Sequence, residues 1–235
     1  MIFPNALPAP ARDAPGAASA RPGTGPVLHL VTNLEAANGA ETMLARLLRA
    51  WPGGERAEVL SLMKVSPRLS AMIGESAASC EALGAASAGG MAAGTLRLAA
   101  LLRRRRPRAL VCWMYHAMAA GALAARMSGT GAPVYWTVRQ SLEDMEAFPP
   151  RLRATVALCR HLAPLATGIV YNSERARDQH ERYGFAASRA AVIPNGFEPP
   201  DEIRVSPRRA RLFGMAARLH PQKDHTPPSW PPPPA

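Results

Sequence analysis

The feature that most constrains this fold is a regular alternation of short apolar runs with longer amphipathic segments between Val27 and Ile193. Runs such as Val27–Val31 and Ala109–Trp113 have the length of buried strands, and segments such as Ala40–Ala50 repeat leucines at helical spacing. This alternation is typical of parallel strands joined by crossover helices. The sequence therefore predicts an α/β fold, a Rossmann-like parallel sheet with helices on both faces.

The expected elements follow from the apolar pattern and from the residues that stop helices. Pro107, Pro164 and Gly184 each follow a helical segment, and Asn172 with Ser173 begins the last one. We expect strands at Val27–Val31, Glu58–Leu62, Ser79–Leu83, Ala109–Trp113, Pro133–Thr137, Gly168–Tyr171 and Ala190–Ile193. We expect helices at Ala40–Ala50, Leu96–Arg105, Ala117–Met127, Arg151–Leu162 and Glu174–Tyr183.

The two ends of the chain differ in composition from this core. Residues 1–25 are rich in proline, alanine and glycine without periodicity, which predicts a disordered leader. The folded domain is expected at 26–197, followed by a polar interdomain linker at 198–209. Residues 210–225 are expected to begin a second domain, and 226–235 form a proline-rich disordered tail.

Charge and cysteine content narrow the function classes. The net charge of +11 suits a phosphorylated ligand or an anionic membrane, and no aromatic-interleaved basic patch supports nucleic acid. The cysteines Cys80, Cys112 and Cys159 lack metal or disulfide spacing, which indicates reduced thiols and no metal site. No apolar run reaches the ~18 residues of a membrane span and no signal peptide is evident. We therefore expect a cytoplasmic protein.

Polar residues follow several of the expected strands, where open α/β sheets bind ligands. The residues just after these strands are Thr32, Asn33, Gly39, Ala40, Glu41, Trp113, Met114, Tyr115, His116, Arg139, Gln140, Asn172, Ser173, Asn195 and Gly196. Because parallel strands end at the same edge, we expect these residues to form one cleft.

Single residues of this set leave alternatives open. His116 takes a proton near neutral pH or caps the following helix. The loop to Gly39 and Glu41 holds a phosphate at a helix start, or it is an ordinary turn. Arg139 pairs with an anionic ligand or a structural carboxylate, and Asn172 is first of all part of a helix start.

Two cations follow the expected strand Ala210–Ala216. Arg218 and Lys223 lie five residues apart. Together they would neutralise a diphosphate, or they form a solvated basic loop.

These segments together resemble glycosyltransferase family 4. The resemblance rests on Val27–Thr32, Asn38–Glu41, Tyr115–Ala117, Val170–Glu174, Val192–Phe197 and Gly214–Lys223. It implies a GT-B fold, with two Rossmann-like domains facing each other. It further implies retaining transfer of a sugar from a nucleotide-sugar to a glycan or lipid-linked acceptor, without metal or other cofactor.

The resemblance also assigns roles to the residues. Gly39, Arg218 and Lys223 would bind the donor diphosphate and stabilise its charge as it leaves. His116 would be the catalytic residue beside the transferred sugar. The acceptor cleft would contain Asn33, Glu41, Tyr115, Arg139, Asn172 and Asn195.

Two departures bear on activity. Asn38-Gly39 stands where the family has two glycines, and most of the donor domain, with its Glu-x7-Glu segment, is missing. We therefore expect a truncated protein of polysaccharide or lipid-linked glycan biosynthesis that is inactive alone, and whether it is an enzyme stays open. The alternative is a non-enzymatic binding module, or a pseudogene product, that acts only with a partner chain. An oxidoreductase-like nucleotide binder is disfavoured because the dinucleotide fingerprint is absent. Peripheral contact with the inner face of the membrane is expected from the basic charge and a lipid-linked acceptor.

Overall fold

A computed structural model describes residues 25–51, 57–74, 79–186 and 189–197 of the chain. They form a seven-stranded sheet in the order β3-β2-β1-β4-β5-β6-β7, in which every neighbouring pair is parallel. The strands are β1 Val27–Val31, β2 Ala57–Ser61, β3 Cys80–Ala82, β4 Ala109–Trp113, β5 Val134–Val138, β6 Gly168–Tyr171 and β7 Ala190–Val192. The helices are α1 Gly39–Arg49, α2 Pro67–Gly74, α3 Ala88–Arg105, α4 Tyr115–Ser128, α5 Pro150–Leu162 and α6 Glu174–Tyr183, with a short 3₁₀ helix η1 at Ala163–Leu165.

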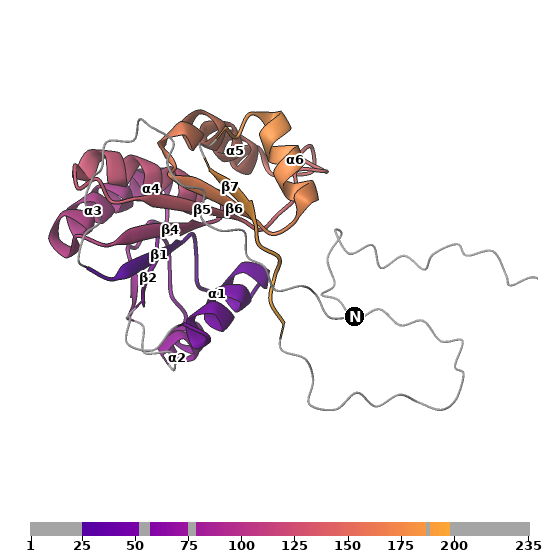
Figure 1. Cartoon of the computed structure of the whole chain (residues 1–235). Helices are drawn as coiled ribbons and strands as arrows, with labels where there is room; N and C mark the ends of the chain where they lie inside the picture. Colours follow the sequence, from indigo (N-terminus) through magenta and orange to yellow (C-terminus); the bar gives the residue numbers. More distant parts are fainter. Residues whose placement is uncertain (1–24, 52–56, 75–78, 187–188, 198–235) are drawn as a thin grey trace, which may run out of the picture. The chain divides into compact units, whose positions relative to one another are not determined.

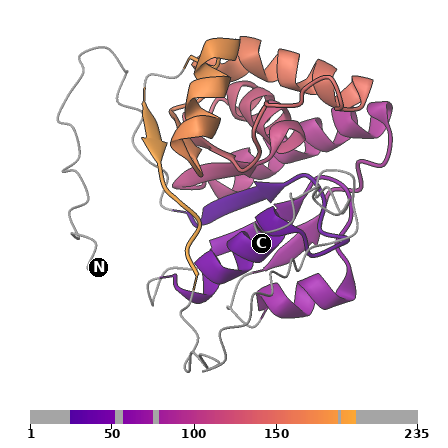
Figure 2. The same ribbon diagram turned by 90° about the vertical axis from the view of Figure 1, so that its right-hand side faces the viewer.

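The sheet is covered on two sides, which confirms the expected Rossmann-like α/β fold. Helices α1 and α2 pack on one face, where Leu44 and Leu69 meet Val59 in a separate apolar cluster. Helices α3, α4 and α5 lie on the other face over a larger core (Figure 1). The turned view shows the sheet between the two sets of helices (Figure 2).

Helix α4 packs closely on the sheet through an inner side made of small residues. Ala117, Ala120 and Ala124 are buried there. At Gly121 a Cβ atom would stand 2.3 Å from the Sγ of Cys112 on β4. Only a residue without a side chain fits at that contact, so this glycine sets the distance between helix and sheet.

The expected strands and most helices are confirmed within a residue or two. Strands β1, β4 and β6 and helix α6 have the expected bounds. Helix α3 begins earlier than the expected Leu96, because the Ser87 hydroxyl caps it by accepting from the Gly90 N–H. Helix α2 was not expected at all, since its eight residues are too few for a clear period. Helix α4 begins at Tyr115 rather than Ala117, which places Tyr115 and His116 inside its first turn.

The chain divides into two compact units, Met1–Gly196 and Phe197–Ala235. The expected leader up to residue 24, the linker at 198–209, the second-domain start at 210–225 and the tail at 226–235 lie outside the described residues. Within the described part, no helix combines the length and apolar character that crossing a bilayer requires.

Candidate functional site

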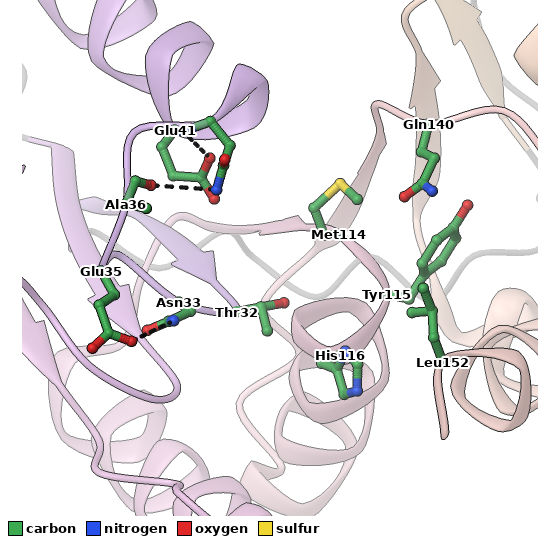
Figure 3. Close-up of a pocket in the computed structure, with 11 residues that line it drawn as sticks. Thr32, Asn33, Glu35, Ala36, Glu41, Met114, Tyr115, His116, Gln140 and Leu152 are labelled. Carbon is green, nitrogen blue, oxygen red and sulfur yellow. Dashed lines mark hydrogen bonds between the residues drawn. The ribbon is translucent and has the colours of Figure 1, made fainter. Parts of the chain in front are cut away.

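A pocket of about 500 Å³ lies at the carboxyl ends of β1 and β4. The strand order reverses between these two strands, which is the point where open α/β sheets bind ligands. The loop after β1 forms one wall and Gln140 with Leu152 the other, and Met114 and His116 lie between them (Figure 3). The lining residues are Thr32, Asn33, Glu35, Ala36, Asn38, Glu41, Met114, Tyr115, His116, Gln140 and Leu152.

The loop after β1 is held in place by its own polar side chains. The Asn33 Oδ1 accepts from the Lys64 N–H at 3.2 Å, and its Nδ2 donates to Glu35 at 3.4 Å. Lys64 also forms an exposed ion pair with Glu35 at 3.6 Å. Asn33 therefore lines the pocket and at the same time fixes the shape of its wall.

The start of α1 brings Gly39 and Glu41 to the same side. Glu41 accepts a hydrogen bond from the Asn38 N–H at 3.1 Å, and burial raises the pKa of this carboxyl group. Gly39 is exposed with a negative φ, and a Cβ there would meet nothing within 4 Å. The backbone does not require glycine at this position, so the space in front of the helix start is open to a ligand.

The connection from β4 to α4 has a strained backbone at Met114. Its φ of 69° and ψ of 161° fall in a region that is normally restricted to glycine. Such a conformation costs about 1–3 kcal/mol and persists only when its surroundings impose it. Met114 lines the pocket, so the strain is located at the site itself.

His116 lies in the first turn of α4, whose cap position is Met114, so the ring does not cap the helix. Its Nε2 is 3.3 Å from the Thr155 hydroxyl on α5, and that hydroxyl donates its one hydrogen to the Arg151 carbonyl at 2.9 Å. The Thr155 oxygen must therefore accept from Nε2–H, which leaves the lone pair of the neutral ring on Nδ1. Partial burial lowers the pKa of His116, which favours the neutral ring that is able to take a proton.

Tyr115 contributes to the pocket wall, but its hydroxyl lies in the core. The side chain is 1% exposed, and its hydroxyl bonds to His180 Nε2 at 2.8 Å. The His180 Nδ1 contacts the Ala176 carbonyl at 2.7 Å and so carries the hydrogen, which makes Tyr115 the donor to Nε2. The sequence did not single out His180. Its position four residues after Ala176 places both residues on the same, buried side of α6, and this spacing was the available signal.

Arg139 and Asn195 are brought together beside the pocket rather than in its lining. The guanidinium donates to Asn195 Oδ1 at 2.7 Å and lies 5.1 Å from the centre of the Trp113 ring. Burial lowers the pKa of Arg139, and its buried Nε has no hydrogen-bond partner among the residues that the structure describes. Its partner is an amide rather than the carboxylate of a salt bridge. Asn172 is half-buried, and its backbone N–H donates to the Val138 carbonyl at 3.2 Å.

The charged side chains of the described lining are Glu35 and Glu41, and this lining contains no lysine or arginine. Arg218 and Lys223, the expected diphosphate ligands, lie outside the described residues. Thr32, Met114 and Gln140 follow expected strand ends and were expected at this edge without an assigned role, whereas Leu152 was not expected as a lining residue. Across the described ranges, no three His, Cys, Asp or Glu side chains are grouped as a metal site would require.

The chain was also compared with known protein families and structures. The model of the family described as Glycosyltransferase Family 4 matches residues 37–199, more than half of the chain. A search of curated proteins found no match.

Several solved structures share the fold. HepE of Anabaena, solved in complex with UDP, has a TM-score of 0.58 at 17% identity over 74% of this chain and 44% of its own. The lipopolysaccharide outer core galactosyltransferase WaaB, in its apo form, has a TM-score of 0.58 at 13% identity over 76% and 50%. A UDP-N-acetylglucosamine 2-epimerase from Rickettsia bellii has a TM-score of 0.51 at 11% identity over 72% and 44%. The chain thus spans about half the length of these structures.

Proposed function

The chain belongs to glycosyltransferase family 4, and we propose that it takes part in transferring a sugar from a nucleotide-sugar to a glycan or lipid-linked acceptor. The observation that carries this proposal is the position of His116 in the pocket lining, with its Nε2 against the Thr155 hydroxyl of α5, which assigns the lone pair of the neutral ring to Nδ1. A base of lowered pKa in a pocket at the switch point suits proton removal from a sugar hydroxyl. UDP in the HepE structure supports a nucleotide-linked donor.

The remaining roles follow from the same proposal. Asn33 and Glu41 would orient acceptor hydroxyls, because amide and carboxylate oxygens accept hydrogen bonds from them. Gly39 would leave room for the donor, and Arg218 with Lys223 would neutralise its diphosphate. We propose that neither a metal nor another cofactor takes part.

We further propose that the chain alone does not complete the transfer. It spans about half the length of the structures it matches, and its described pocket carries acidic side chains but no cation. Such a pocket favours a neutral sugar over a diphosphate. This observation also supports the second candidate function, a sugar-binding module that acts with a partner chain.

The test measures UDP release from UDP-glucose and UDP-galactose by the full chain, with a panel of neutral sugars as acceptors, with and without EDTA. Backbone chemical shifts of the pocket are recorded in the same mixtures. We expect the sugars to shift the resonances of residues 32–41 and 114–116 without UDP release.

Each other outcome has a definite meaning. UDP release that falls about 10²–10⁴-fold in His116→Ala, but not in the exposed control His161→Ala, would support transfer and overturn the proposed incompleteness. Release that stops with EDTA would overturn the metal-free proposal. Neither release nor shifts with any sugar would refute both candidate functions.

We also propose a cytoplasmic location with peripheral contact to an anionic membrane, since the chain carries a net charge of +11.

A further inference from the structure

Acidic residues are absent from a large part of this sequence. No Asp or Glu occurs from Ala82 to Leu142 or from Ala147 to Ser173. The same two stretches contain eleven arginines: Arg97, Arg103, Arg104, Arg105, Arg106, Arg108, Arg126, Arg139, Arg151, Arg153 and Arg160. The positive charge of the chain is therefore concentrated rather than spread evenly.

The fold gathers these stretches on one side of the sheet. They build α3, α4 and α5, which pack against each other in that order (Figure 1). We call the outward side of these three helices the basic helical face; the exposed arginines of the three helices are Arg97, Arg103, Arg104, Arg126, Arg151, Arg153 and Arg160. None of these seven forms an ion pair within the described ranges, whereas Arg105 is paired with Glu58 and Glu81.

Large apolar side chains are exposed on the same helices. Leu96 is 60% exposed, Leu123 37%, Met127 43% and Leu158 45%, and Leu165 of η1 is 42% exposed. These are five of the eight large apolar residues that are exposed in the described part of the chain. Cations that form no ion pair, interleaved with apolar side chains, are the composition of a surface that binds at a membrane interface.

We propose that the basic helical face binds the surface of an anionic lipid bilayer. Each arginine near such a surface strengthens binding about fivefold, and the leucines add apolar contact below the headgroups. A nucleic acid would supply the same negative charge, but these three helices expose no Phe, Tyr or Trp ring on which bases could stack, only the imidazole of His161. The observations therefore favour the bilayer.

The geometry also relates this face to the pocket. Leu152 lines the pocket and lies six residues before Leu158 on the same helix, about 9 Å along its axis. His116 and Leu123 have a similar relation on α4. A bilayer on the basic helical face would thus lie within about two helical turns of the pocket, in reach of an acceptor carried by a lipid. The inference rests on the proposed membrane contact and is independent of the chemistry in the pocket.

The experiment measures binding of the full chain to vesicles of phosphatidylcholine with and without phosphatidylglycerol, at low and high salt. The test variant Arg153→Gln/Arg160→Gln removes two charges from α5. The control variant Arg49→Gln/Arg68→Gln has the same net charge but is altered on α1 and α2, over the opposite face of the sheet. Thermal melting of both variants checks that they fold like the parent.

We expect binding only to the anionic vesicles, weakened about 25-fold in the test variant and much less in the control. Leu158→Ser should weaken the binding that remains at high salt. Equal losses in the two double variants would show a diffuse charge effect and overturn the assignment of this face. Absence of vesicle binding, or stronger binding to single-stranded DNA through the same arginines, would overturn the bilayer itself. If the chain binds vesicles but sugars change no backbone chemical shifts of the pocket residues and cause no UDP release, the proposed function is refuted and this inference still holds.

Discussion

Gly121 gives the most direct test of the close contact between α4 and the sheet. In Gly121→Ala the new Cβ would stand 2.3 Å from Cys112 Sγ, and 3.3 Å and 3.4 Å from methyl carbons of Leu110 and Leu30. Ordinary contact begins near 3.4 Å, so the helix or the thiol must move by about 1 Å. Cys112 is fully buried, so its sulfur has little room to move aside.

The expected magnitude is the difference of two effects. Overpacking a close-packed core costs about 1–3 kcal/mol or more, and alanine gains about 1 kcal/mol over glycine in a helix. We expect Gly121→Ala to lower the free energy of unfolding by about 1–2 kcal/mol. For a domain of this size that corresponds to a Tm lower by about 2–8 °C.

The assay is urea unfolding followed by circular dichroism, with Gly89→Ala as the matched control. Gly89 also lies in a helix, but a Cβ there meets nothing within 4 Å, so that variant should be unchanged or slightly more stable. Adding Cys112→Ala to Gly121→Ala should cost less than the sum of the two single changes, because the sulfur that clashes is gone. A Gly121→Ala protein as stable as the parent would refute the close contact.

Three further predictions concern the buried polar groups and the strained connection. Burial holds the pKa of His29 and of His180 at about 4, below the usual 6.5, so the unfolded chain binds more protons between these values. As pH drops from 6.5 to 5, stability in urea should fall by about 1 kcal/mol per pH unit for each histidine, and a flat profile would contradict this. Arg139→Lys should lower the free energy of unfolding nearly as much as Arg139→Ala, by about 1–2 kcal/mol in the same assay. The reason is that a lysine ammonium does not reproduce the planar guanidinium, which both covers the Trp113 ring and donates to Asn195. Recovery of stability in the lysine variant would argue against that geometry. The Met114→Gly protein should be more stable than the Met114→Ala protein by about 1–3 kcal/mol, because only glycine accepts the φ of 69° at this position without strain. Equal denaturation midpoints of the two variants would mean that the backbone at this position is unstrained.

Much of the fold was available from local patterns. The strands β1, β4 and β6 are short runs of apolar residues bounded by turn residues, and this apolar pattern predicted their first and last residues correctly. Helix α6 begins at a serine cap and ends at Gly184 in the left-handed conformation, two signals that are fully local. Helix α2 and the early start of α3 were missed, because eight residues or an Ala/Gly-rich turn carry little periodicity.

The sequence by itself determined the βα order, and with it the edge of the sheet where Asn33, Glu41 and His116 meet, because parallel strands all end on one side. Only the tertiary structure decided what each polar group does there. It turned the hydroxyl of Tyr115 into the core toward His180 and paired Arg139 with Asn195, since these contacts join residues 65 and 56 positions apart in the chain. It also assigned the lone pair of His116 to Nδ1 and gathered the unpaired arginines of α3, α4 and α5 on one face. Hydrogen bonds and charge fields depend on distance in space, which no local period of the sequence encodes.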